Sequence, residues 1–138
     1  MIISFDTNIL VYATASPPDA KALRARELIT RAMRAGSTIL MLQTLAEFAN
    51  VAIRKAGIPI EDIRRIIDAW RAVLPIQVAD ADDLAAALEA FKAHRLPFWD
   101  ATLWASAQRA GVRCLLTEDL QDGFILQSVI RQPIQTSK

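Results

Sequence analysis

The sequence is poor in the side chains on which most zinc, redox and nucleophile sites depend. It has one cysteine, Cys114, and one histidine, His94. A lone cysteine cannot form an internal disulfide, so stability must come from an apolar core, which 138 residues can build as one domain. We expect Cys114 to be a buried thiol in a reducing, cytoplasmic setting, and His94 to lie on a helix surface. Zinc chemistry and histidine-based nucleophilic catalysis are therefore poorly supported.

Long apolar runs and glycine-rich motifs are also lacking. No stretch approaches the roughly 18 apolar residues of a membrane span, and residues 2–5 have no basic lead-in typical of a signal peptide. There is no glycine-rich phosphate loop and no Gly-x-Ser-x-Gly elbow. We therefore expect a soluble protein that does not contact membranes. The hydrophobic fraction of 53% is high for such a protein and favours a buried interface with a partner or a second copy.

Short apolar runs alternate with longer stretches of helical period, which predicts an α/β fold with a parallel sheet. The expected strands are residues 2–5, 38–41, 76–79 and 113–116. The expected helices are residues 19–35, 43–56, 59–73, 80–94 and 98–110, several of them ended by glycine. Residues 124–134 fit either a short strand or irregular chain. We find no repeat, linker or low-complexity tract, so one domain over residues 1–138 is expected.

Four acidic residues have notable positions relative to these elements. Asp6 follows the first expected strand and Asp119 follows the fourth, and ligands of open parallel sheets bind beyond the carboxyl ends of strands. Glu47 is the one charged residue within 42–51, where a half-buried carboxylate needs a compensating partner. Asp100 lies near a helix start, where it could equally offset unpaired backbone amides.

Carboxylates that meet without a cation repel one another, and some then take up protons. Oxygen ligands suit Mg²⁺ or Mn²⁺, and a carboxylate-held divalent ion is well suited to phosphodiester hydrolysis, because it activates a bound water and neutralises phosphate charge. A metal-dependent phosphodiesterase is therefore the chemistry that the residues favour.

The order of these motifs resembles the PIN-domain family, and within it the toxin ribonucleases of VapBC toxin–antitoxin pairs. The resemblance begins with Asp6 in Ile3-Ser4-Phe5-Asp6-Thr7-Asn8 and continues with Glu47 in Gln43-Thr44-Leu45-Ala46-Glu47-Phe48. Asp100 in Phe98-Trp99-Asp100-Ala101 matches the third acid, and Asp119 in Leu116-Thr117-Glu118-Asp119 matches the fourth. It covers essentially the whole chain.

The resemblance implies a three-layer α/β/α fold, with a central parallel sheet of four to five strands and the acids at the strand carboxyl ends. It implies an endoribonuclease that cuts single-stranded RNA with a metal-activated water, leaving a 5′-phosphate and a 3′-hydroxyl. Asp6, Glu47, Asp100 and Asp119 would hold Mg²⁺ or Mn²⁺.

Three further residues keep two interpretations each. Asn8 and Thr117 could orient carboxylates or water from behind, or could cap the next helix or turn. Asp122 could reach the metal through a water, or could form the turn into Gly123.

The resemblance also implies partners. These are a VapB-like antitoxin lying on apolar surface of helices within residues 19–73, the RNA substrate, and a second copy in a homodimer. The alternative is a PIN-like domain that binds RNA or protein without cutting. A phosphatase with Asp6 as nucleophile would want a second acid at position 8, which is Asn8.

Overall fold

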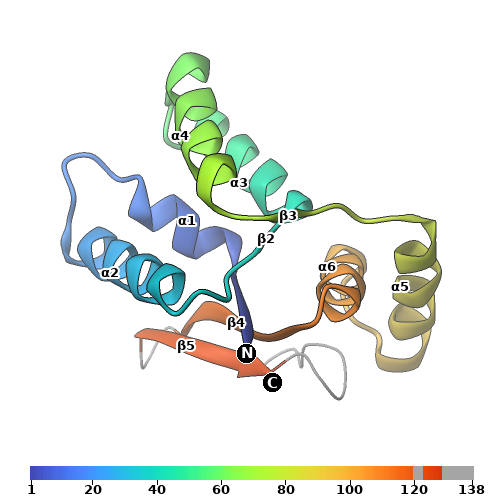
Figure 1. Ribbon diagram of the computed structural model, residues 1–138. Coiled ribbons are helices and arrows are strands. Elements are labelled where there is room, and N and C mark those ends of the chain that lie inside the picture. The colour runs from blue at the N-terminus through green and yellow to red at the C-terminus, as the bar shows by residue number, and fades with distance from the viewer. Residues whose placement is uncertain (120–122, 129–138) are drawn as a thin grey trace.

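The computed structural model describes the backbone of residues 1–119 and 123–128, and side chains as far as Thr117 (Figure 1). Helices and strands alternate along it. The strands are β1 (Ile2–Phe5), β2 (Leu40–Met41), β3 (Ile76–Gln77), β4 (Val112–Asp119) and β5 (Gly123–Ser128). The helices are α1 (Thr7–Ala13), α2 (Ala20–Arg34), α3 (Leu42–Arg54), α4 (Ile60–Val73), α5 (Ala81–His94) and α6 (Phe98–Arg109).

The strands lie in the order β3-β2-β1-β4-β5. β1 pairs in parallel with β4, with Phe5 opposite Leu116, and β2 pairs in parallel with β3. A parallel bridge joins the two halves, since the Ile3 N–H donates to the Ser37 carbonyl at 2.7 Å and the Ile39 N–H donates to the Ile3 carbonyl at 3.1 Å. The expected central parallel sheet is confirmed, with β5 added as an antiparallel edge strand.

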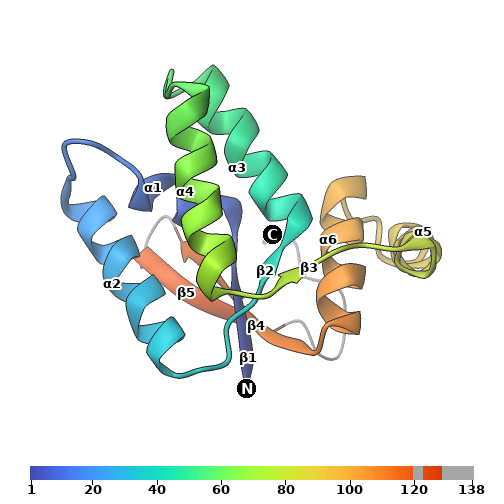
Figure 2. The same ribbon diagram turned by 45° about the horizontal axis from the view of Figure 1, so that its top comes forward.

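The sheet is covered by helices on both faces, as its alternating side chains require. Phe5 and Leu116 belong to a core formed with α1, α2, α3 and α4. Leu115 and Val112 belong to a second core formed with α6, against which α5 packs through small residues. Figure 2 shows α1 and α2 on one side of β1, α6 and then α5 on the other, and α3 and α4 beyond the end of β1. The expected three-layer α/β/α architecture is therefore present.

Helix α1 has no counterpart among the elements expected from the sequence. Its segment, Thr-Asn-Ile-Leu-Val-Tyr-Ala, is short and contains several β-branched residues, which are weak helix formers. A local cap and tertiary burial stabilise it. The Asp6 carboxylate accepts a hydrogen bond from the Thr7 N–H at 2.8 Å, and Ile9 and Leu10 are buried in the core. Burial and capping therefore decide this helix, and local propensity does not.

The expected end of the fourth strand, at Leu116, was wrong. β4 continues to Asp119 because β5 pairs with it antiparallel as far as the pair Asp119–Gly123. The uncertain segment 124–134 is a strand as far as Ser128, and its remainder lies outside the described residues. Cys114, expected to be buried, is only half-buried, because its side chain packs next to the exposed Met1, with its Sγ 3.5 Å from the Met1 Sδ.

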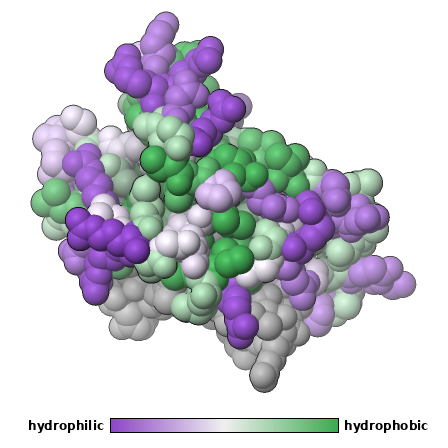
Figure 3. Space-filling view, in the orientation of Figure 1, coloured by the Kyte–Doolittle hydropathy of each residue, from purple (hydrophilic) through white to green (hydrophobic). Residues whose placement is uncertain are grey.

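Apolar side chains also reach the surface. Ile53, Ile60, Val73 and Trp99 are each about half exposed or more. The space-filling view shows hydrophobic residues gathered in the middle of one face, between hydrophilic surfaces over α4 and over α5 (Figure 3). None of the described helices has the length and apolar character needed to cross a membrane. His94, at the end of α5, is exposed as expected.

Candidate active site

Asp6 is fixed at the carboxyl end of β1, against the neighbouring strand β4. Its N–H donates to the Leu116 carbonyl at 2.8 Å. One carboxylate oxygen, Oδ1, accepts from the Thr7 N–H at 2.8 Å, and the other, Oδ2, accepts from the Thr117 hydroxyl at 3.0 Å. Backbone and side chain are thus both held, and the Asp6 carboxylate has a defined orientation at the edge of the sheet.

Glu47 and Asp100 approach the same edge from two different helices. Glu47 lies in the second turn of α3, which starts directly after β2, and Asp100 lies in the first turn of α6. Figure 2 shows the first turns of α1, α3 and α6 converging where β1 ends. Both side chains reach solvent, yet the surrounding protein removes part of their hydration.

The electrostatics show that these three acids are neighbours. Partial burial raises the pKa of Glu47, and the negative charges of Asp6 and Asp100 raise it further, while the Gln43 hydrogen bond lowers it. Burial also raises the pKa of Asp100, and the charge of Asp6 adds to that effect. The ionised forms of Glu47 and Asp100 are therefore less favourable in the folded chain than in water.

Gln43 connects the two helices that carry Glu47 and Asp100. Its Nε2 donates to the Trp99 carbonyl at 2.8 Å, and its Oε1 accepts from the Thr102 hydroxyl at 2.8 Å. A longer contact of 3.5 Å joins Nε2 to the Glu47 carboxylate. Sequence reasoning did not assign Gln43 or Thr102 this role. The position of Gln43, one helical turn before Glu47, was the signal available for it.

The remaining expected site residues are only partly within the described structure. The backbone of Asp119 ends β4, three residues past the Leu116 that pairs with the last residue of β1. The side chain of Asp119 and the whole of Asp122 lie outside the description. Asn8 lies in the first turn of α1 with its side chain exposed. Among the described side chains, no three of the His, Cys, Asp and Glu type are arranged to hold one metal ion.

A comparison with family models matches residues 3–124 to the PIN domain. The chain belongs to the PIN-domain family. A search of curated protein sequences finds no match.

Solved structures show the same PIN fold. The VapC20 structure from Mycobacterium tuberculosis, described as a sarcin-ricin loop cleaving toxin, has a TM-score of 0.67 at 20% identity, over 89% of this chain and 96% of that one. The VapBC2 structure from Rickettsia felis, bound to a promoter DNA fragment, has a TM-score of 0.65 at 20% identity, over 88% and 90%. FitAcB from Neisseria gonorrhoeae has a TM-score of 0.53 at 14% identity, over 80% and 84%.

The donor set of this PIN domain fits a hard divalent cation. Asp6, Glu47 and Asp100 offer only carboxylate oxygens, which are preferred by Mg²⁺ and Mn²⁺. The charge effects on the pKa values of Glu47 and Asp100 come from other carboxylates and all act in one direction. A divalent cation among them would remove that repulsion, so the electrostatics and the ligand chemistry agree.

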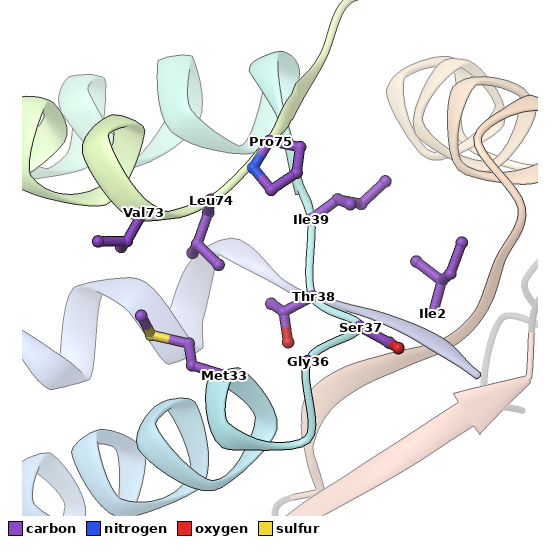
Figure 4. Close-up of a pocket in the computed structure, with 9 residues that line it drawn as sticks. All are labelled: Ile2, Met33, Gly36, Ser37, Thr38, Ile39, Val73, Leu74 and Pro75. Carbon is purple, nitrogen blue, oxygen red and sulfur yellow. The ribbon is translucent and has the colours of Figure 1, made fainter.

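One hollow of the PIN domain, of about 590 Å³, is distinct from the acidic cluster. Figure 4 shows that its side chains come from the end of α2, the segment before β2, and the end of α4, and they include Met33, Thr38 and Leu74. These segments precede β2 and β3, so the hollow lies at the amino ends of the parallel strands. Asp6, Glu47 and Asp100 lie at the opposite edge, and the hollow has no carboxylate in its lining.

Proposed function

We propose that this PIN domain is a metal-dependent endoribonuclease that cuts single-stranded RNA, and that it is the toxin of a VapBC-type toxin–antitoxin pair. One observation carries the proposal. Three carboxylates from β1, α3 and α6 lie at one edge of the sheet, where partial burial and the charges of neighbouring acids raise the pKa values of Glu47 and Asp100. Membership of the PIN-domain family also supports the proposal.

In the proposed mechanism, Asp6, Glu47, Asp100 and Asp119 would hold Mg²⁺ or Mn²⁺, with Asp122 as a further candidate ligand. When bound, the ion would activate water and neutralise charge on the phosphate. The Thr7 amide and the Thr117 hydroxyl fix the Asp6 carboxylate.

Proton transfer is the second contribution of the chain's own residues. One of the four acids would accept the proton of the attacking water. The water oxygen bonds to phosphorus while the bond to the 3′-oxygen breaks. The 3′-oxygen leaves with a proton as a hydroxyl, and the phosphate stays on the 5′ side.

The proposed partner is an antitoxin segment that packs on apolar surface. Two grooves flank the end of α1. One, of about 360 Å³, is lined by Val11, Phe48 and Ile58, and the other, of about 420 Å³, is lined by Ile29 and Trp70. The structural neighbour from Rickettsia felis is described as VapBC2, which makes a paired antitoxin the natural occupant to propose. A homodimer is proposed as well, on the exposed apolar surface seen in Figure 3.

Hydrolysis of a fluorescent single-stranded RNA by the purified chain tests this proposal. With Mn²⁺ we expect cleavage that EDTA abolishes. Asp6→Asn should lower the rate by more than about 100-fold, because even groups that only support a metal ligand cost about 10- to 100-fold when removed.

Asp68→Asn is the matched control, since Asp68 lies on α4 in an exposed ion pair with Arg71. It should cut like wild type. Cleavage by Asp6→Asn at the wild-type rate would refute the catalytic assignment. Binding of RNA without cleavage by the wild type would favour a non-catalytic PIN domain instead.

A further inference from the structure

The side chain of Trp99 is unusually exposed for a tryptophan. Its exposed fraction is 66%, the largest among the exposed aromatic side chains of the described residues. Tryptophan is mostly buried in folded proteins, because its large apolar surface is costly to leave in water. Trp99 contributes little to the core, so its ring is available for contact with another molecule.

The ring is nonetheless held in place. It packs edge-on against Phe98, with ring centroids 4.9 Å apart and an interplanar angle of 74°. Phe98 in turn packs edge-on against Phe91 of α5, at 6.3 Å and 75°. The Trp99 carbonyl accepts hydrogen bonds from Gln43 Nε2 and from the Thr102 hydroxyl, both at 2.8 Å. The backbone of Trp99 is thus fixed and its ring packs against Phe98, which lowers the conformational freedom that the ring loses on binding.

Its position relative to the acids is what indicates a ligand. Trp99 precedes Asp100 in the chain, and the Gln43 side chain that bonds its carbonyl also contacts Glu47. The surroundings carry negative charge, because the acidic residues at the end of β1, in α3 and in α6 lie at this same edge of the sheet. These charges repel the phosphate groups of an RNA chain, so contacts that involve the bases are favoured here. Stacking of a base on an aromatic ring is such a contact.

We propose that Trp99 is a stacking platform for one unpaired nucleobase of the RNA, beside the phosphodiester bond that is cut. This inference rests on the proposed function and adds a substrate-binding residue to it. Stacking needs a base whose face is free, so a base inside a duplex does not fit. Trp99 would thus favour single-stranded substrate, and it would do so for any base, because every base has a face that stacks.

RNA binding and cleavage by Trp99→Ala and Trp99→Phe test the platform. Binding is measured in Mn²⁺ with Asp6→Asn as the background, so that the RNA stays intact, and kcat and KM are measured without that background. We expect Trp99→Ala to weaken binding and to raise KM, each roughly 10-fold, with little change in kcat. Trp99→Phe should retain most of the affinity. Val73→Ala, at an exposed apolar residue on the end of α4, is the control and should bind as the parent does.

An abasic nucleotide moved along the RNA gives a readout that a merely structural role would not produce. One abasic position should weaken binding to the parent, and the same change should have no further effect on Trp99→Ala, because the stacking partner is already gone. Equal abasic penalties in both proteins, or unchanged affinity and KM in Trp99→Ala, would overturn the proposal.

Two other outcomes are separable. If Trp99→Ala alters the oligomeric mass in light scattering and leaves the abasic response intact, the ring packs against a second copy and the proposal fails. If the wild type cuts RNA but Trp99→Ala behaves identically, this inference alone is lost. If the wild type does not cut RNA with Mn²⁺, the proposed function itself is wrong.

Discussion

Two regions of the molecule bring acidic side chains close together, and the pKa values of these acids shift in opposite directions in the two regions. At the contact of α5 with α6, the Asp83 side chain is only 4% exposed. Arg109 donates two hydrogen bonds to its carboxylate, from Nε to Oδ1 at 2.7 Å and from Nη2 to Oδ2 at 3.0 Å. Those hydrogen bonds are the main reason that the pKa of Asp83 is lowered. At the carboxyl edge of the sheet, the pKa values of Glu47 and Asp100 are raised.

The α5–α6 region shows what this chain does with an acid that serves the fold. Asp83 also accepts from the Asp80 N–H at 3.0 Å in a reciprocal capping box at the start of α5, and Arg109 donates to the Val78 carbonyl at 2.7 Å. Asp80 and Asp83 thus share the charged partner Arg109. The comparison teaches that the crowding at Asp6, Glu47 and Asp100 is not a general feature of the protein, and unfavourable crowding kept in one place is typical of a functional site.

The largest expected effect comes from neutralising one acid in each region. Asp100→Asn should reduce RNA cleavage by more than about 100-fold, for the reason given for Asp6. It should leave the melting temperature at neutral pH unchanged or raised, since it removes a repelled charge. Asp83→Asn should instead lower stability and leave cleavage unchanged. Cleavage per folded molecule stays at the wild-type level, and the free energy of unfolding falls by about 2 kcal/mol, because the charged partner of Arg109 is lost.

Cleavage rates and chemical denaturation of both variants measure this contrast. A fall in stability of Asp100→Asn as large as that of Asp83→Asn would show that Asp100 is a structural residue. The distinction between the two regions would then disappear.

A smaller effect is expected at the hydrogen bond behind Asp6. Thr117→Val keeps the shape of the side chain but removes the hydroxyl that donates to Asp6 Oδ2 at 3.0 Å. We expect cleavage to fall roughly 10-fold, because the carboxylate loses one of the two groups that orient it. Thr117→Ser, which keeps the hydroxyl, should cut nearly as well as wild type. If Val and Ser are equivalent, the hydroxyl does not orient Asp6 during the reaction.

The smallest effect is a difference in how stability depends on pH without divalent cations. The pKa of Asp83 is lowered from its ordinary 3.8, so its contribution to stability is present above that pH and is lost as pH falls through the folded-state value. The pKa values of Glu47 and Asp100 are raised from 4.5 and 3.8. Their contribution is therefore present at low pH and is lost as pH rises through the raised values.

Melting temperatures in EDTA between about pH 3 and pH 7 follow both trends. The melting temperature of the double variant Glu47→Gln/Asp100→Asn should rise relative to that of wild type as pH rises. The difference should be small because both groups reach solvent. Asp83→Asn should be most deficient at neutral pH and should approach wild type in acid. Parallel profiles for the two variants would contradict the assigned pKa shifts.

Part of the candidate site could be predicted from the sequence, and the signal differed from residue to residue. Asp6 was predicted as a site residue because it follows the first expected strand. Glu47 was predicted because it is the one charged residue in the apolar segment 42–51. Asp100 kept two interpretations until the family resemblance was used. Gln43 was missed because its contact with the Trp99 carbonyl joins residues 56 positions apart. Helix α1 was missed because a cap and burial form it, and its own propensity does not.

The sequence by itself determined five of the helices, the parallel strands and the family, because helical period, glycine stops and apolar runs are local patterns that need no partner. Tertiary structure alone decided which acids have a positively charged partner and which have only acidic neighbours. Asp83 and Arg109 are 26 residues apart in the chain, and Asp6, Glu47 and Asp100 come from three different elements. Charge interactions act through space and depend on partial burial, so the same residue type has a lowered pKa at Asp83 and a raised one at Asp100.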